Sequence, residues 1–388
     1  MSATVHTRAE HEDLRRQVAR FVAQEVEPNA AAWDEQGYVP REVLRRMGAL
    51  GWLGLMVAEA DGGAGADMIT NVVFQEALAR STSGGFVITV LVHTDMASPH
   101  LVHAGSAAQK QRWLASVLSG AVITAVAISE PDAGSDVAAI RTRATRDGAS
   151  YVLNGTKMFI TNGVHADLLF VAARTESAAE RGGRSAHGIS MLAVERGTPG
   201  LRVGRALRKH GWLASDTAEL VFEDCRVPAA NLLGDENGGF YAIMRNFQVE
   251  RIALSSMAVG EAQTALDLTW NYVRERKAFG ATLWDQQSVR QRLAMLAAKV
   301  EAARLFLYHC AWKVDQKQNA VREVSMLKAL TGELVNEVMY DCQQFHGGAG
   351  YMRESPIERL VRDARVLAIG GGATEVMLEE VAKRWEPA

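Results

Sequence analysis

The stretch AISEPDAGSD, residues Ala127–Asp136, follows directly on the apolar run Ala121–Ile128. This change in composition predicts a buried strand that runs into a polar turn. Gly134 and Ser135 would let a ligand come close to the backbone of such a turn, because glycine has no side chain and serine supplies a hydroxyl. The ten residues by themselves fit equally well a surface turn that ends a strand.

The composition is that of an ordinary globular protein. The chain has 388 residues, of which 48% are apolar and 22% charged. A chain of this length is too long for one compact core, so we expect two or three subdomains. The net charge of -3, from 42 basic and 45 acidic residues, gives no electrostatic reason to expect nucleic acid or an anionic membrane surface as a partner.

Cysteine usage and the apolar pattern point to a cytoplasmic protein. Cys225, Cys310 and Cys342 are far apart and odd in number, which disfavours a disulfide framework and fits a reducing compartment. The first 21 residues contain no apolar signal core and begin an amphipathic helical pattern. No run of about 18 apolar residues occurs, so we expect no membrane span.

The pattern of apolar residues changes twice along the chain and predicts an α+β fold. Residues 1–121 read as an α-helical domain, residues 122–236 as a β domain and residues 237–388 as a second helical domain. Within the β domain, Asn154-Gly155 in the run Ser150–Ile160 predicts a hairpin turn, and the polar stretch Arg174–Gly188 predicts a mobile loop. Further strands are expected at Leu168–Ala172, Ile189–Val194 and Ala218–Phe222. Long helices are expected at Phe240–Glu275, Gln287–Gln316 and Val321–Phe345, as in a bundle.

Glu250 occupies an unusual position in the predicted helix 240–258. On a helical wheel it lies within the apolar stripe formed by Ile243, Phe247, Leu254 and Met257. Carboxylates are rarely buried unless they are paired or functional, because desolvation is costly. Glu250 could therefore be a structural ion-pair partner of a nearby arginine, or a general base whose pKa is raised toward neutrality.

Two other features have a functional and a structural interpretation. IGGGA, residues Ile369–Ala373, is either a helix-breaking hinge or a backbone whose free N–H groups stabilise charge on a substrate oxygen. His93, His100 and His103 lie close together, but without cysteines or paired carboxylates at ligand spacing they favour core or helix-end histidines over a metal site.

Four sequence blocks together resemble the acyl-CoA dehydrogenase family, and the resemblance covers nearly the whole chain. The blocks are AISEPDAGSD (Ala127–Asp136), KMFITNG (Lys157–Gly163), RERKAFG (Arg274–Gly280) and QFHGGAGYMRESPIERLVRD (Gln344–Asp363). Each block is moderately specific, and four in the family's order make a strong match. The resemblance implies an N-terminal helical domain, a middle β-barrel-like domain and a C-terminal four-helix bundle.

The resemblance also implies a tightly bound FAD. Phe159 and Thr161 would lie against the isoalloxazine ring, with the Thr161 hydroxyl near flavin N5, while Ser129 and Ser135 would contact the flavin and pyrophosphate region. Residues that resemble those holding the ADP half across a subunit boundary are Arg276, Phe279, Gln287, Gln344, Gly347 and Gly348. The remaining cofactor-binding positions are Ile128, Gly134 and Glu375. Family members are usually homotetramers.

The position of the catalytic glutamate departs from many family members. Those members carry it in a Tyr-Glu-Gly-Thr run near the C-terminus, where this chain has Gly370–Ala373. The long-chain and isovaleryl enzymes instead use a glutamate in a Glu-Arg pair on the earlier helix, which corresponds here to Glu250-Arg251. The resemblance therefore implies Glu250 as the base, the same residue that the helical wheel selects.

The implied reaction converts an acyl-CoA to its trans-2-enoyl-CoA, with electrons passed to an electron-transferring flavoprotein. The Gly371 N–H would bind the thioester carbonyl, and the implied substrate-binding positions are Ser135, Tyr241, Arg251, Gly371 and Gly372. Gly370 replaces a tyrosine of the medium-chain enzyme, which favours a branched acyl chain, whereas other blocks look closer to the long-chain enzyme. The alternatives are an acyl-CoA oxidase, a dehydrogenase of carrier-bound acyl groups and a non-catalytic acyl-CoA-binding flavoprotein.

Overall fold

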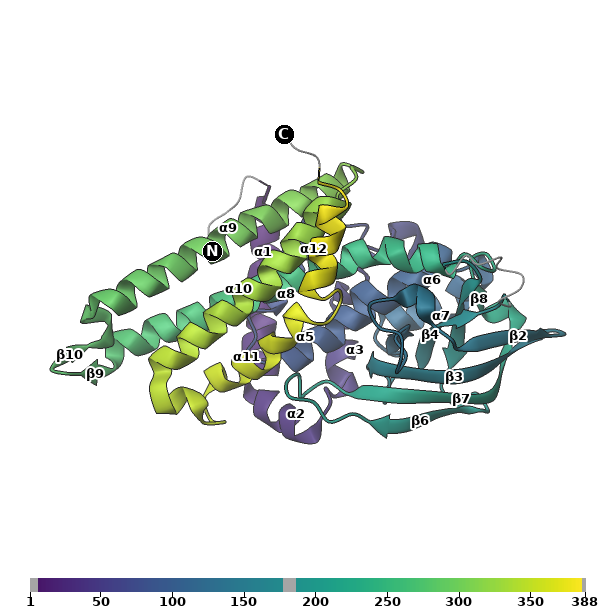
Figure 1. The fold of residues 1–388 in the computed structure, drawn as a ribbon, viewed down its shortest axis with the longest axis horizontal. Coiled ribbons are helices and arrows are strands. Elements are labelled where there is room, and N and C mark those ends of the chain that lie inside the picture. Colours follow the sequence, from purple (N-terminus) through teal and green to yellow (C-terminus); the bar gives the residue numbers. More distant parts are fainter. Residues whose placement is uncertain (1–5, 177–185, 386–388) are drawn as a thin grey trace.

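The structure, a computed structural model, describes residues 6–176 and 186–385 (Figure 1). Helices form the first part of the chain, a sheet the middle and long helices the last part, which confirms the α+β class and the α–β–α order. The predicted loop Arg174–Gly188 lies in large part outside the described residues. No helix in the described ranges combines the length and the apolar character that crossing a membrane requires.

The N-terminal part consists of short helices, two of which, Met68–Leu78 and Gly84–Leu91, are almost wholly buried. The helices are α1 (Ala9–Phe21), α2 (Ala30–Gln36), α3 (Arg41–Ala49), α4 (Met68–Leu78), α5 (Gly84–Leu91), α6 (Ser98–Ala104) and α7 (Ala107–Leu118). Every residue of α5 is buried, as expected for a helix that is apolar on all sides. Between α5 and α6 the chain forms the π-helical segment η5 (Val92–Ala97), which contacts both α8 and β1.

The middle part is a mixed sheet. Its strands are β1 (Thr124–Ala127), β2 (Arg143–Asp147), β3 (Ser150–Thr161), β4 (Leu168–Arg174), β5 (Ile189–Glu195), β6 (Leu201–Ala206), β7 (Thr217–Pro228) and β8 (Leu232–Leu233). The strand order is β6-β7-β3-β2-β4-β5-β8, and β1 pairs in parallel with β4. β4 and β5 are buried along almost their whole length, so they read as continuous apolar runs.

The hairpin predicted at Asn154-Gly155 is wrong. β3 continues through both residues, and the turn lies earlier, where Asp147 of β2 pairs with Ser150 of β3. Asn154-Gly155 instead marks a shift in the pairing of β3 with β7 between Leu153 and Gly155. Gly155 has φ +152°, and a Cβ there would come within 2.5 Å of Thr142 Oγ1, so the glycine serves a bulge and a close contact rather than a turn.

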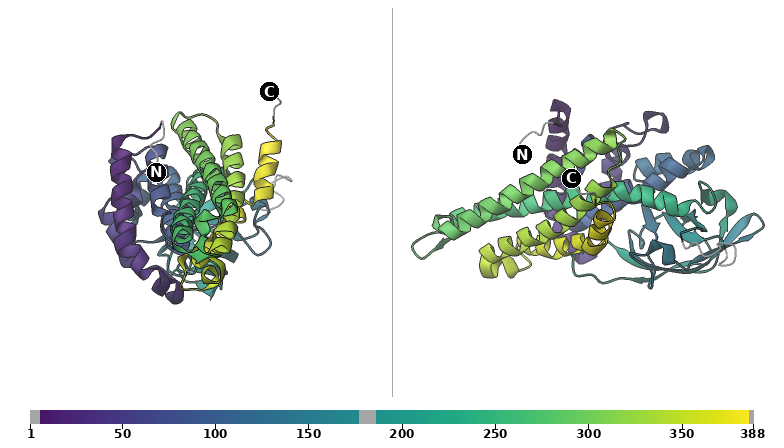
Figure 2. Two further views of the ribbon diagram at one scale, coloured as in Figure 1. Left: turned by 90° about the vertical axis from the view of Figure 1, so that its left-hand side faces the viewer. Right: turned by 45° about the horizontal axis from the view of Figure 1, so that its top comes forward.

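Three long helices dominate the C-terminal part (Figure 2). They are α8 (Gly239–Glu275), α9 (Gln287–Asp315) and α10 (Val321–His346), and the shorter α11 (Pro356–Ala364) and α12 (Thr374–Ala382) pack on α10. The small hairpin β9 (Lys277–Ala278) and β10 (Ala281–Thr282) joins α8 to α9. Figure 1 shows α8 running from the sheet to this hairpin at the opposite end of the molecule.

Candidate active site

Glu250 is buried on α8, with 6% of its surface exposed. Its Oε1 accepts a hydrogen bond of 2.9 Å from Asn246 Nδ2, one helical turn earlier, and among the described residues it forms no ion pair. Burial raises the pKa of the Glu250 carboxyl to about 8, and the nearby Asp95 carboxylate adds to the shift, whereas Asn246 and Arg251 oppose it. A carboxyl with this pKa changes protonation near neutral pH, as a general base would, so the general-base interpretation stays a prediction that the geometry supports.

Asn246 fixes the direction of the Glu250 carboxyl. Its Nδ2 also donates to the carbonyl oxygens of Asp95, at 3.2 Å, and Met96, at 3.1 Å. Both carbonyls belong to η5, so the amide is anchored outside its own helix. Asn246 was not predicted from the sequence, although its i, i+4 spacing from a candidate base was available as a signal.

Asp95 is a second buried carboxylate near Glu250. Its oxygens accept hydrogen bonds from Asn71 Nδ2 at 2.7 Å, Gln75 Nε2 at 2.8 Å and Thr94 Oγ1 at 2.6 Å. Burial raises the pKa of the Asp95 carboxyl despite these three donors. No sequence pattern pointed to Asp95, because the residues that surround it come from α4 and η5 and meet only in the folded chain.

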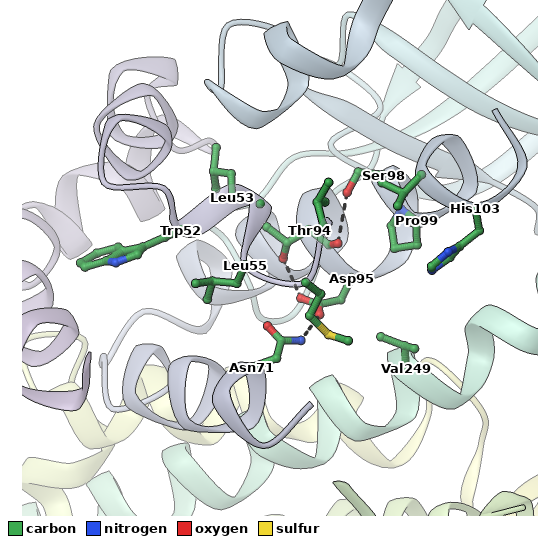
Figure 3. A pocket seen from close by; sticks show the side chains of 14 residues that line it. Trp52, Leu53, Leu55, Asn71, Thr94, Asp95, Ser98, Pro99, His103 and Val249 are labelled. Atoms are coloured by element: carbon green, nitrogen blue, oxygen red, sulfur yellow. Dashed lines mark hydrogen bonds between the residues drawn. The ribbon is translucent and has the colours of Figure 1, made fainter. Parts of the chain in front are cut away.

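A cavity of about 60 Å³ adjoins this network (Figure 3). Figure 3 shows Asn71, Thr94 and Asp95 on its wall together with Val249 of α8, which precedes Glu250 in the chain. Its other walls come from Trp52–Val57 and from Ser98, Pro99, Val102 and His103. The cavity therefore lies beside the Glu250 segment of α8, although Glu250 itself does not line it.

The glycine loop, Gly370–Gly372, lies against α8 one turn beyond Glu250. A Cβ placed on Gly371 would come within 2.1 Å of Leu254 Cδ1, and Gly371 has φ +63°. In the described part of the chain, the Gly371 N–H donates to no other group. The fold thus brings a free backbone donor from the C-terminal segment to the part of α8 that carries the buried carboxyl.

Two sequence blocks of the middle part lie side by side. The Met158 N–H donates to Ser129 O at 2.9 Å, which joins β3 to the turn after β1. At this point the pairing of β3 with β7 shifts between Lys157 and Ile160, and Phe159 takes φ 63° with 68% of its surface exposed. The bulge turns an aromatic side chain outward, a strained arrangement that is typical of functional sites.

A buried ion pair holds this bulge in place. Lys157 Nζ donates to Glu130 Oε1 at 2.8 Å and to Ile128 O at 2.8 Å. Glu130 also accepts from the N–H groups of Arg141, at 2.6 Å, and Thr142, at 2.9 Å. Burial opposes ionisation of Glu130, but Lys157 and these donors outweigh it and lower the pKa of the carboxyl. Both residues stand in the quoted blocks, but their pairing required the tertiary structure.

His93 of η5 is hydrogen-bonded to both β1 and α7. Its Nδ1 accepts from the Thr124 N–H of β1 at 3.1 Å, and its Nε2 lies 3.1 Å from Val117 O. Burial lowers the pKa of His93 to about 4, as expected for a neutral core histidine. In residues 6–176 and 186–385, no group of three histidine, cysteine or acidic side chains could hold a metal ion.

Comparisons with known proteins cover nearly the whole chain. Family models match its three parts: "Acyl-CoA dehydrogenase, N-terminal domain" at residues 8–121, "middle domain" at 125–225 and "C-terminal domain" at 237–385. The chain belongs to the acyl-CoA dehydrogenase family. The fold described above is therefore that of an oxidoreductase of this family.

Among the curated relatives are a long-chain acyl-CoA dehydrogenase and an isovaleryl-CoA dehydrogenase, the two types that the sequence blocks resemble. The long-chain specific acyl-CoA dehydrogenase of Sus scrofa is 41% identical over 97% of this chain and 86% of its own length. The isovaleryl-CoA dehydrogenase of Pongo abelii is 36% identical over 95% of this chain and 86% of its own.

Solved structures agree over the same length. The acyl-CoA dehydrogenase from Geobacillus kaustophilus matches with a TM-score of 0.94 at 40% identity, covering 98% of this chain and 99% of its own. A structure described as the FAD complex of PigA matches with a TM-score of 0.93 at 28% identity, covering 99% of both chains.

The other candidate cofactor- and substrate-binding residues of this acyl-CoA dehydrogenase differ in exposure. Gly134 and Ser135 are exposed in the turn after β1, and Thr161 is half-buried and pairs with Thr217 of β7. Tyr241, in the first turn of α8, has 66% of its surface exposed. Arg251 is buried against Phe247, with its guanidinium carbon 5.6 Å from the ring centre.

The residues predicted to hold the ADP half lie far from Phe159 within one chain. Arg276 and Phe279 belong to the β9–β10 hairpin, and Figure 1 shows this hairpin at the end of the molecule opposite the sheet. Gln287 begins α9, whereas Gln344, Gly347 and Gly348 stand where α10 ends. Phe279 is fully exposed, and Glu375 is exposed on α12. One chain therefore does not bring the two groups of candidate FAD residues together.

Proposed function

We propose that this acyl-CoA dehydrogenase oxidises a long-chain or branched-chain acyl-CoA to the trans-2-enoyl-CoA, with Glu250 as the catalytic base. The observation that carries the proposal is a buried carboxyl with a pKa of about 8, one helical turn from the segment against which Gly371 packs. A base and an unpaired backbone donor at this separation suit the two ends of an enolising thioester.

FAD is the cofactor of the family, and the residues present fit it. Phe159 offers an exposed aromatic face beside the half-buried Thr161, and Ser129 and Ser135 supply hydroxyls on the neighbouring turn. A Cβ on Gly134 would meet no atom within 4 Å, so a ligand has room to approach this backbone. When bound, FAD accepts the hydride that leaves the substrate β-carbon.

Glu250 would remove the proton from the α-carbon of the thioester. The carboxyl must be ionised to do so, and a pKa of about 8 keeps it basic enough to accept a carbon-bound proton. The C–H electron pair then forms the new double bond as the β-hydrogen departs as hydride. Asn246 would hold the carboxyl in the direction of the α-carbon.

The Gly371 N–H would donate a hydrogen bond to the thioester carbonyl oxygen. Negative charge develops on that oxygen as the α-proton leaves, and a preoriented backbone donor stabilises it without reorganising. Gly372 follows at φ +109°, a conformation that also requires glycine, so the loop could hold this geometry only with these residues.

The substrate class rests on Gly370 and on the relatives. A Cβ on Gly370 would stand in ordinary van der Waals contact with Val366 at 3.7 Å, and the glycine leaves free the volume that a tyrosine side chain would fill. The relatives of Sus scrofa and Pongo abelii are named for a long-chain and a branched-chain substrate.

The partners follow from the same reasoning. The separation of Phe159 from Phe279 within one chain favours a homotetramer in which a second subunit completes each FAD site. We propose an electron-transferring flavoprotein as the acceptor and a cytoplasmic location; one matched structure is described as "Electron transferring flavoprotein of Acidaminococcus fermentans".

An anaerobic titration of the purified flavoprotein tests the proposal. Flavin absorbance near 450 nm would be followed as isovaleryl-, a longer β-methyl-branched, octanoyl- or palmitoyl-CoA is added. We expect bleaching by the branched or the long-chain substrates. A yellow protein that none of them bleaches would contradict the proposal and favour a carrier-bound substrate or a non-catalytic role, and rapid oxygen consumption would favour an oxidase.

A further inference from the structure

Lys328 of α10 is a buried lysine whose hydrogen-bond partners, in the part of the chain that the structure describes, are two backbone carbonyls. It has 2% of its surface exposed, and Nζ donates to Leu367 O at 2.7 Å and to Gly372 O at 3.1 Å. Among the described residues it forms no ion pair. Buried lysines are costly, so one that is not neutralised by a carboxylate calls for a physical role.

The two carbonyls lie at either end of the segment that contains Gly371. Leu367 precedes the glycine loop and Gly372 closes it, so a single ammonium joins the two ends. Two further α10 residues on the same face, at i+4 and i+8, also contact this segment. A Cβ on Gly332 would come within 2.8 Å of Leu367 O, and Asn336 Nδ2 lies 3.3 Å from Ala364 O. α10 is therefore the support on which the glycine loop rests.

Support from α10 restricts the conformation of the glycine loop. Gly371 has φ +63° and packs against Leu254 of α8, the helix that carries Glu250. The segment around it is held from the other helix, α10, through the two carbonyls that Lys328 binds. Without the ammonium, a loop of three glycines would have many backbone conformations of similar energy. The bonds to Leu367 O and Gly372 O select one of them.

The charge of Lys328 acts in addition to its hydrogen bonds. Burial lowers the pKa of Lys328 to about 8, Arg251 of α8 lowers it further and Glu333 of α10 opposes the shift, so the amine carries its proton at neutral pH. A buried positive charge polarises the peptides bound to it and stabilises negative charge nearby more strongly than it would in water. The face of the loop opposite α10 is thereby made more favourable for a developing oxyanion.

We propose that Lys328 is a positioning residue for the dehydrogenation: it clamps Leu367 O and Gly372 O, orients the Gly371 N–H toward the thioester carbonyl and supplies a positive charge behind that donor. The proposal rests on the function proposed above. Lys328 touches neither substrate nor cofactor and acts through the glycine loop.

The test measures the acidity of a bound substrate analogue rather than turnover alone. In 3-thiaoctanoyl-CoA a sulfur replaces the β-carbon, so the enzyme can remove the α-proton but no hydride can leave. The resulting enolate beside the oxidised flavin produces a long-wavelength charge-transfer absorption. The pH at which half of this absorption develops reports how well the site stabilises the enolate.

We expect Lys328→Met to shift that midpoint upward by about one pH unit or more and to lower kcat roughly 10- to 100-fold, with a much smaller change in KM. Lys328→Gln, which retains N–H donors but no charge, should show a smaller shift in the same direction. Lys313→Met is the matched control, because Lys313 is a half-buried lysine of α9 paired with Glu323, and it should leave the midpoint unchanged.

FAD content and melting temperature are measured on each variant. If Lys328→Met does not retain FAD, Lys328→Gln decides the question. The role of Lys328 would be overturned if the variant that retains FAD had the same midpoint pH as the wild type and a kcat within twofold of it. If no acyl-CoA bleaches the wild-type flavin, the proposed function itself fails, so the two failures are distinguishable.

Discussion

Gly371 and Leu254 are in such close contact that a single Cβ on the glycine would lie 2.1 Å from the leucine Cδ1. Leu254 stands one helical turn after Glu250 on α8, whereas Gly371 belongs to the segment between α11 and α12. Through this contact, the backbone of Gly371, the candidate carbonyl donor, packs on the helix that carries Glu250, the candidate base. Substitutions at this contact should therefore change catalysis and stability together.

Gly371→Ala should lower both stability and turnover. The positive φ of Gly371 costs an alanine about 1–2 kcal/mol, and the overlap with Leu254 adds about 1–3 kcal/mol of strain. Leu254→Ala relieves the overlap but removes a buried core side chain, which by itself typically costs about 2–5 kcal/mol, so the two substitutions together should destabilise the protein by less than the sum of their separate effects. Gly370→Ala is the control for stability, because its Cβ would have neighbours no closer than 3.7 Å. Equal melting temperatures for the two alanine variants would contradict this prediction.

Glu250→Gln should abolish dehydrogenation without releasing FAD. A general base contributes about 10²–10⁴-fold to a rate, so kcat should fall by at least a hundredfold while the visible spectrum of the flavin persists. Glu261→Gln is the matched control, since Glu261 is also a buried glutamate of α8 and lies three turns further along. Stopped-flow bleaching of the flavin measures both, and intact turnover in the Glu250 variant would remove it from the mechanism.

The pH dependence of kcat/KM should report the environment of Glu250. Because the base must be ionised, kcat/KM should rise with pH through the Glu250 pKa of about 8. Asn246→Ala removes a bond that stabilises the carboxylate and should move the profile to higher pH. Asp95→Asn removes a charge that raises the Glu250 pKa and should move it to lower pH. Shifts of the same sign in both variants would refute this assignment.

Glu261 should make the protein less stable as the pH rises. Neither of its carboxyl oxygens has a partner in the described structure, and burial followed by repulsion from Asp363 raises its pKa well above the usual value. The folded chain then keeps a proton that the unfolded chain loses above pH ~4.3, so stability is greatest below that pH and falls as the pH rises toward the folded pKa.

Glu261→Met should remove this loss. We expect the variant to gain roughly 1–3 kcal/mol over the wild type at pH 8 and much less at pH 5. Thermal unfolding at a fixed scan rate at the two pH values provides the measurement. A stabilisation that is the same at both would show that Glu261 does not titrate on unfolding in this range.

Lys157→Met should destabilise the flavin side of the site. The substitution leaves the Glu130 carboxylate buried without its cation, a change that typically costs about 3–5 kcal/mol. It also frees the Ile128 carbonyl that Lys157 binds, so the bulge at Phe159 should loosen and FAD content should fall. The double variant Lys157→Met/Glu130→Gln should recover part of the stability, and FAD absorbance with the melting temperature checks both. No recovery would mean that Lys157 acts mainly through Ile128.

Local patterns in the sequence were sufficient for several elements. The runs around Leu168–Ala172 and Ile189–Val194 are buried on both faces, so their continuous apolar character predicted β4 and β5. β2 and β6 were missed because most of their residues are exposed, which removes the apolar signal. The hairpin turn predicted at Asn154-Gly155 was wrong because the dipeptide that favours a tight turn also suits a bulge within a long strand.

The sequence by itself determined the α–β–α order, the family and the choice of Glu250, since helical periodicity and four sequence blocks depend only on neighbours along the chain. The tertiary structure alone decided which groups act on that carboxyl. Asn246 is anchored by η5, Asp95 is enclosed by α4, and Gly371 reaches α8 from more than a hundred residues further along the chain. The pKa of a buried group depends on the desolvation and charges that these long-range contacts create, and no periodicity in the sequence records them.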